Sequence, residues 1–540
     1  MNSLVPLPVV LPLVVCGLTL FIGPRLRWLH RLITVGVLAA VVAVDVILLV
    51  AADRTGPLVV HLGDFGPPLG VTLVADRLAA LMLLVSGAVT FIVLIYAMSQ
   101  GMADREESAP IAVFHPAYLV LVAGVSLTFL AGDLVNLYVG FEIMLMASFV
   151  LLTVGATEPR VRAGSTYVVV SLVSSLVFLC GIAVCYAAVG TVNFAQLAQR
   201  MPELPLGVRT LADVLLLTVF GVKAAAFPVA AWLPDSYPTA PAPVTAVFAG
   251  LLTKVGVYSM IRADTLFFPG NRLSGALMAV AFLSMIIGIL GAVAQTDLKR
   301  LLSFTLVSHI GFMLYGLALG SRGGIGGAIV YTAHHITVQT TLFLAAGLLE
   351  KRYGTTELTR LGGTMRSAPL LAALWFVPAM NLAGIPPLSG FLGKLGLMRA
   401  GAADGGAWSY TLLAAAAVTS LLTLYVMAKV WNLVFWRAAA TQPAEEGDVL
   451  EESDDPDSAP DDAGGGGGGG AGGGGGTSTA TAVCVRTTTR IPRVMTAATA
   501  AAVLLGLSYT LLATPLTGLA DRSAAELLSR TPYVEAVLAP

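Results

Sequence analysis

The chain has 540 residues, of which 57% are hydrophobic and only 11% are charged, and its mean hydropathy is +0.86. A soluble protein carries roughly a quarter charged residues. The composition therefore excludes a soluble protein and predicts an all-α polytopic membrane protein surrounded by lipid. The net charge of −1 gives no reason to expect a nucleic-acid partner.

Apolar runs divide the chain into about 14 predicted transmembrane helices, because each run is close to the roughly 20 residues that a membrane crossing needs. The runs are 4–22, 30–50, 77–99, 113–131, 133–154, 164–189, 211–230, 243–262, 272–294, 300–320, 325–349, 370–399, 407–436 and 494–516. No soluble catalytic domain fits between them, so the chain is not expected to be an enzyme. The four cysteines and the loops contain no metal-ligand spacing and no nucleotide-binding motif, and no cofactor or metal is expected.

The loops predict the orientation of the chain. With an outer N-terminus, sixteen Lys and Arg residues fall in cytoplasmic loops and ten in outer loops and the tail. Because cytoplasmic loops are richer in basic residues, both termini are expected outside a bacterial-type plasma membrane. Residues 438–490 hold ten acidic residues and two polyglycine runs, Gly464–Gly470 and Gly472–Gly476. Such a segment cannot pack a core, which predicts a disordered cytoplasmic insertion whose simplest role is a spacer.

Two predicted helices contain proline breakers. The seventh has Pro228 and is followed by Pro234, and the twelfth contains the segment Asn381–Gly390 with two adjacent prolines. Proline removes a backbone donor and disturbs the preceding turn, so helices 7 and 12 are expected to be broken. Interrupted helices at corresponding places in two halves are typical of transporters, whose freed backbone groups line polar cavities.

Four basic residues remain inside predicted helices, and all are lysine: Lys223, Lys254, Lys394 and Lys429. Lysine can release its proton in an apolar site, whereas arginine effectively cannot. A charge near the bilayer centre is costly, which favours a function for the first three. Lys429 lies about two turns from the cytoplasmic end of its helix, where snorkelling or packing is the better interpretation.

Glu142 lies in the middle of the fifth predicted helix and needs a partner, for which Lys223 is the natural candidate. The pair is either a static structural contact or one that opens and closes during transport. His309, His334 and His335 lie in the tenth and eleventh helices and are candidate proton carriers. Adjacent His334 and His335 point about 100° apart on a helix, and His335 is favoured because Gln339 follows it by one turn. His309 fits a relay or a structural hydrogen bond equally well.

Five segments carry a resemblance to a known family. They are Phe220–Pro228, Ala231–Thr245, Leu251–Tyr258, Asp297–Gly311 and Ile385–Lys394. They resemble the proton-conducting antiporter family, which comprises Mrp antiporter subunits and the antiporter-like subunits of respiratory complex I. Three further segments resemble the D-type subunits of Mrp antiporters: Glu142–Ser148, Gly190–Ala198 and Pro532–Leu538.

The resemblance implies two inverted five-helix repeats, at 111–262 and 263–437, between N-terminal helices at 1–110 and a last helix with its tail at 491–540. It implies that Glu142 and Lys223 form a coupling ion pair and that Lys254 is the central proton carrier. His335 would bridge the middle of the line and Lys394 would end it. Other Mrp-type membrane subunits are the implied partners, with protons and Na⁺ or another monovalent cation as transported ions.

Two departures from the family pattern stand out. Gln339 occupies a stretch where close relatives are expected to have lysine, so a water or a histidine would have to replace one titratable group. The acidic and polyglycine insertion is the other departure. The leading hypothesis is a proton-translocating subunit of a sodium/proton antiporter. The alternatives are a proton-pumping subunit of a complex I or membrane hydrogenase type redox enzyme, and a purely structural scaffold.

Overall fold

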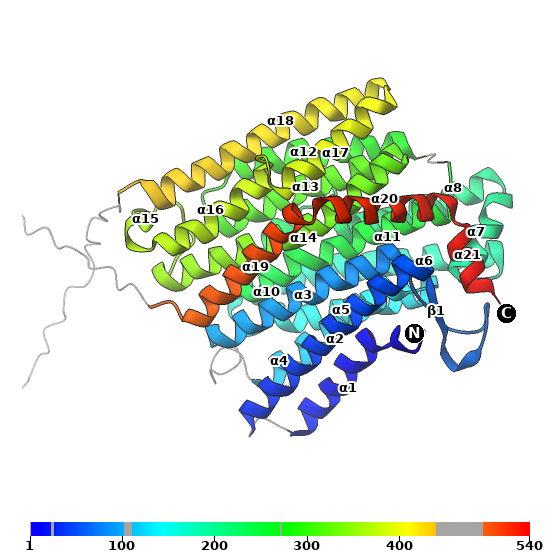
Figure 1. Cartoon of the computed structure of the whole chain (residues 1–540), viewed down its shortest axis with the longest axis horizontal. Helices are drawn as coiled ribbons and strands as arrows, with labels where there is room; N and C mark the ends of the chain where they lie inside the picture. Colours follow the sequence, from blue (N-terminus) through cyan, green and yellow to red (C-terminus); the bar gives the residue numbers. More distant parts are fainter. Residues whose placement is uncertain (1, 23–25, 102–110, 271–272, 439–489, 540) are drawn as a thin grey trace, which may run out of the picture.

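The chain folds into a bundle of long helices in the computed structural model, which describes residues 2–22, 26–101, 111–270, 273–438 and 490–539 (Figure 1). The predicted insertion, apart from its two end residues, lies outside the described residues. The all-α prediction is confirmed: the only named strands in the described part are β1 (Leu58–His61) and β2 (Thr72–Ala75). They form an antiparallel hairpin in which Leu58 pairs with Ala75 and His61 with Thr72.

The helices follow the predicted apolar runs closely. The first half contains α1 (Leu7–Ile22), α2 (Arg27–Thr55), α3 (Arg77–Gln100), α4 (Ile111–Leu130), α5 (Leu134–Thr153), α6 (Glu158–Val189), α7 (Phe194–Arg200), α8 (Leu206–Ala224), α9 (Trp232–Ser236), α10 (Ala242–Val247), the π-helical turn η5 (Phe248–Leu252) and α11 (Thr253–Leu266). The second half contains α12 (Ser274–Ala294), α13 (Leu298–Leu319), α14 (Arg322–Tyr353), α15 (Thr364–Ser367), α16 (Pro369–Ala383), α17 (Ser389–Asp404), α18 (Ala407–Val430), η6 (Trp431–Trp436), α19 (Arg493–Leu511), α20 (Ala513–Ser529) and α21 (Thr531–Leu538).

Short polar side chains fix where several helices begin. Asp76, Asp133 and Asp297 precede α3, α5 and α13, and each carboxylate accepts a hydrogen bond from a backbone N–H in the first turn. Ser321 does the same for α14. Such N-caps satisfy donors that have no partner within the helix, which matters most where water is scarce.

Eleven helices of the described chain are long and apolar enough to cross a membrane, so the chain is a multi-pass membrane protein. The other three predicted crossings correspond to α8, α14 and the α16–α17 pair, which do not meet those criteria of length and apolarity. The count of 14 therefore stays a prediction, as do the inverted repeats and the domain boundaries.

Two helices end within predicted crossings. Helix α8 ends at Ala224, and Ala225 takes a left-handed backbone conformation with φ of 57°. Helix α16 ends at Ala383, Gly384 is left-handed with φ of 88°, and α17 starts at Ser389. Lys223 lies in the last turn of α8, and Lys394 lies in α17 just after the second of these helix ends.

Helix α14 is the centre of the bundle. Almost every residue from Gly324 to Leu349 is buried, because α3, α13, α16, α17, α19 and α20 all pack against it. The N- and C-terminal ends of the chain lie at the same end of the bundle (Figure 1). The tail that follows the last predicted crossing forms α20 and α21, and α20 packs against α14 and α3.

Candidate proton-transfer site

Three lysines are buried in the bundle, and among the described residues none of them forms an ion pair. Lys223 is 9% exposed, Lys254 is fully buried and Lys394 is 3% exposed. They come from α8, α11 and α17 respectively. Each ammonium group is instead placed against a backbone carbonyl or an aromatic ring.

Lys223 and Glu142 are not in contact with each other in this structure. The Glu142 carboxylate accepts a hydrogen bond from the Ser175 hydroxyl of α6. The Lys223 ammonium lies 5.7 Å from the centre of the Phe141 ring, a cation–π distance. The expected direct ion pair is therefore absent among the ion pairs of the described chain, because a hydroxyl and a ring occupy the two groups separately.

A small cavity adjoins Lys223. Its volume is about 10 Å³, and its lining includes Tyr167, Ser171, Trp232 and Leu252. This is close to the smallest space that holds one water molecule. Leu252, which ends the π-helical turn η5, is the lining residue nearest in sequence to Lys254.

The Lys254 ammonium is held by the π-helical turn that precedes it. Its ammonium donates a hydrogen bond of 2.5 Å to the carbonyl oxygen of Ala249, inside η5. Single π-helical turns are uncommon and are frequent at functional sites. Gly256 allows α11 to approach α8, since a Cβ there would lie 2.5 Å from the Ala224 nitrogen. The segment of α11 that contains Lys254 therefore packs against the end of α8, which carries Lys223.

The histidines form one cluster between α13 and α14. The ring centres of His309 and His335 are 5.1 Å apart. The Nδ1 of His309 is 2.7 Å from the Tyr331 hydroxyl, and its Nε2 is 3.5 Å from the Thr423 hydroxyl. Both ring nitrogens of His335 are buried without a protein partner in the described chain. Helix α11, which carries Lys254, contacts both α13 and α14.

His334 points to the break between α16 and α17. Its Nδ1 lies 2.9 Å from the Ser389 hydroxyl, which is 3.2 Å from the side-chain nitrogen of Asn381. The Asn381 side-chain oxygen also accepts a hydrogen bond of 2.8 Å from the backbone N–H of Gly390. The sequence favoured only His335 for a shared polar region, whereas both histidines have polar or aromatic neighbours that lead to Lys394.

Lys394 binds the C-terminal end of α16. Its ammonium donates hydrogen bonds of 3.0 and 3.1 Å to the carbonyl oxygens of Leu382 and Ala383, in the last turn of α16. These carbonyls have no partner within the helix and carry its partial negative charge. The ammonium also lies 5.0 Å from the centre of the Phe312 ring, and that ring is 5.7 Å from His309.

Two secondary candidates have different surroundings. The Gln339 side-chain nitrogen donates a hydrogen bond of 2.8 Å to the carbonyl oxygen of Leu302, so Gln339 binds a backbone group of α13. The Lys429 ammonium donates hydrogen bonds of 2.8 and 2.9 Å to the carbonyl oxygens of Val293 and Gln295, at the end of α12. This contact favours the packing interpretation for Lys429.

Sequence reasoning missed the neutral members of the site, which are Ser175, Tyr331, Asn381, Ser389 and Thr423. Tyr331 had a usable signal, because it precedes His335 by one helical turn and so shares its face. Ser175 had none, because serine is common in the sixth helix and its contact with Glu142 depends on how two helices pack.

Comparisons with known proteins give the family. The family described as NADH:quinone oxidoreductase/Mrp antiporter, transmembrane region, matches residues 131–423. The chain is 40% identical over 440 residues to the D-type subunit of the Na⁺/H⁺ antiporter of Alkalihalophilus pseudofirmus, covering 81% of this chain and 87% of that one.

Solved structures agree with the sequence comparison. A chain of the Mrp complex from Dietzia sp. superposes with a TM-score of 0.86 and 31% identity, covering 99% of both chains. A chain of respiratory complex I from Thermus thermophilus gives a TM-score of 0.74 and 25% identity, covering 97% of this chain and 99% of that one. The protein therefore belongs to the family of membrane subunits shared by NADH:quinone oxidoreductases and Mrp antiporters.

Proposed function

We propose that this chain is the proton-translocating subunit of a hetero-oligomeric sodium/proton antiporter in a bacterial plasma membrane. The relative in Alkalihalophilus pseudofirmus is named as the D-type subunit of a Na⁺/H⁺ antiporter, and the similar chain from Dietzia sp. belongs to an Mrp complex. Other Mrp-type membrane subunits are the partners, and protons and Na⁺ or another monovalent cation are the transported ions. Both termini face outside in this proposal.

One observation supports proton transfer most strongly. Three buried lysines lie against carbonyls or rings, and in the described chain none is paired with a carboxylate. A lysine fixed in a buried ion pair has a strong reason to keep its proton, since leaving one charge unpaired is expensive. A carbonyl accepts a hydrogen bond from the charged and from the neutral amine, so the proton remains exchangeable.

The proposed order of transfer follows the contacts. Glu142 and Lys223 lie at one end, on α5 and α8, with the small cavity beside Lys223. Lys254 stands next, against η5. His335 and His309 bridge to Tyr331 and His334, and the polar groups at the break of α16 lead to Lys394.

A matched pair of substitutions tests the proposal. Lys254→Gln keeps an N–H donor for the Ala249 carbonyl but cannot carry a proton, and sodium-driven proton movement in everted membrane vesicles should fall to background. Lys429→Gln makes the same change in a lysine that holds the end of α12, and transport should persist. Copurification of the other subunits shows that each variant assembles.

Undiminished transport by assembled Lys254→Gln complex would reject the proposed role and would favour the structural scaffold. A second candidate function follows from the similarity to a complex I chain: a proton-pumping subunit of a redox enzyme. Copurification of subunits that carry flavin and iron–sulfur clusters would support this second function. Copurification of small membrane subunits without redox groups would support the antiporter.

A further inference from the structure

An acidic residue is buried in an apolar helix that carries none of the three lysines. Asp45 is in α2, in the apolar stretch 41–50, and only 1% of its surface is exposed. Neither carboxylate oxygen has a hydrogen-bond or ion-pair partner in the described part of the chain. A helix rises 1.5 Å per residue, so Asp45 is about 12 Å from Asp53 along α2.

The neighbouring helix makes room for this carboxylate. Gly87 of α3 faces Asp45, and a Cβ at that position would lie only 2.5 Å from the Asp45 Oδ2. An acid at the bilayer centre costs about 2.5–3.5 kcal/mol on insertion scales. No ion pair among the described residues offsets that cost, so packing alone does not account for an aspartate here.

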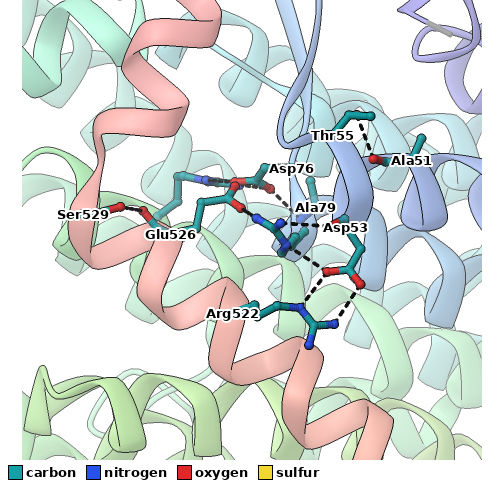
Figure 2. Close-up of polar contacts among 10 residues, drawn as sticks. Ala51, Asp53, Thr55, Asp76, Ala79, Arg522, Glu526 and Ser529 are labelled. Atoms are coloured by element: carbon teal, nitrogen blue, oxygen red, sulfur yellow. Dashed lines mark hydrogen bonds and ion pairs between the residues drawn. The ribbon is translucent and has the colours of Figure 1, made fainter.

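Polar groups lie toward the end of α2 that carries Asp53. Asp53 binds Arg77 of α3 at 3.0 Å and Arg522 of α20 at 2.8 Å. Arg77 also pairs with Glu526. Figure 2 shows this cluster of α2, α3 and α20, with Arg522 and Glu526 on one helix facing Asp53 and Asp76.

Polar groups also lie in the opposite direction. Gly87 is flanked on α3 by Ser86 and Thr90, and the Thr90 carbonyl accepts a hydrogen bond of 2.7 Å from Tyr118 of α4. His115 lies one turn before Tyr118 on α4 and is fully buried. Its ring centre is 6.3 Å from that of His30, in the first turn of α2.

We propose that Asp45 is a second proton-binding site of this chain, on a polar column through α2, α3 and α4 that is separate from the lysines and histidines of the first site. The carboxyl group takes up a proton from one side of the bundle and releases it to the other. His30 and His115 stand at one end of the column, and Asp53 and Arg77 at the other.

The elements packed around Asp45 bring few other charges. Helix α1, which packs on α2, has no charged residue between Leu7 and Ile22. The charged residue of α3 is Arg77. In the described part of α4, the titratable residue that faces α2 is His115. Helix α19, which packs on α3, has a single charged residue, Arg493, at its start. In this proposal the carboxyl exchanges its proton through the column.

Carbodiimide labelling of the intact complex tests the site without a mutation. Dicyclohexylcarbodiimide dissolves in membranes and attacks protonated carboxyl groups. The acid proton passes to a carbodiimide nitrogen, the carboxylate oxygen adds to the central carbon, and the adduct rearranges to a stable N-acylurea. We expect mass spectrometry to find the label on Asp45, with a rate that falls as the buffer is made alkaline. No label, or a rate independent of pH, would overturn the proposal.

Substitutions test whether the proton matters for transport. Asp45→Asn and Asp45→Leu should reduce sodium-driven proton movement by about 100-fold, the lower range for loss of a proton-transfer group, and Asp45→Glu should restore it. Asp64→Asn is the matched control, because Asp64 is an exposed carboxylate of the β1–β2 hairpin with a left-handed backbone that asparagine also adopts. Full transport by an assembled Asp45→Leu complex would overturn the proposal. The lysine route would still be tested separately, because Lys254→Gln leaves Asp45 in place.

Discussion

Glu526 connects α20 to Arg77 of α3, and we expect its protonation to change the stability of α20. Its carboxylate is 6% exposed, and one of its oxygens has no partner in the described chain. The other oxygen accepts a hydrogen bond from Arg77. Burial, aided by the negative charge of Asp76 and opposed by Arg77, raises the pKa of Glu526 from 4.5 to about 7. Asp76 and Glu526 lie close together in Figure 2.

The sign of the pH dependence follows from this shift. An acid whose pKa is higher in the folded state binds its proton more tightly there than in the unfolded chain. Its contribution to stability is therefore full below about pH 4.5 and is lost as the pH rises through about 7. The difference between 4.5 and about 7 corresponds to about 3 kcal/mol, at about 1.4 kcal/mol per pH unit.

Hydrogen exchange of α20 amides in the purified complex measures this effect locally. After correction for intrinsic exchange, protection of residues 513–529 should fall by up to about 100-fold between about pH 5 and about pH 9. Glu526→Gln keeps an oxygen acceptor for Arg77 without a charge, so its protection should stay constant over that range. Asp521→Asn, on the same helix, should retain the pH dependence of the native chain.

An increase in wild-type protection with pH would refute this reasoning. It would mean that the ion pair with Arg77 contributes more than burial costs. In that case Glu526→Gln would be less protected than the native chain in alkaline buffer, whereas we expect it to be more protected.

Three further substitutions follow from the packing. Gly256→Ala should reduce vesicle antiport, because its Cβ would lie 2.5 Å from the backbone of α8 and push Lys254 away from the end of that helix. Arg262→Met removes the guanidinium that lies 2.6 Å from the buried Asp76 carboxylate. The free energy of unfolding should therefore fall by about 3–5 kcal/mol, and the complex should dissociate at a lower temperature. Gly390→Ala should also lower antiport in vesicles, since a Cβ there would overlap the Asn381 carbonyl oxygen of α16.

Much of the fold could be predicted because lipid simplifies the physics. Apolar runs must become helices, and the run predicted at 77–99 is the helix Arg77–Gln100. The structured tail could not be predicted in the same way. Helix α20 is less apolar than a membrane crossing, and its position depends on contacts of Arg522 and Glu526 with residues more than 400 positions away.

The candidate site could be predicted in its charges but not in its contacts. Charge at membrane depth marks a residue from sequence alone, which identified Lys223, Lys254 and Lys394. The same rule applies to Asp45, a single acid in the run 30–50, but a count of basic residues alone overlooks it. Whether Glu142 meets Lys223 depends on side-chain conformation and on the competing hydroxyl of Ser175, and no sequence pattern encodes that.

The backbone next to Lys254 and Lys394 explains why lysine suits these positions. A helix end offers carbonyl oxygens without partners, and these attract an ammonium group through their partial charge while leaving it free of a full countercharge. Lys394 has this arrangement at the end of α16, and Lys254 has a similar one in the π-helical turn. A full carboxylate would hold the proton permanently, and an entirely apolar site would never accept it. Partial charges lie between these extremes, so the irregular backbone beside Lys254 and Lys394 suits amines that exchange protons in the proposed route.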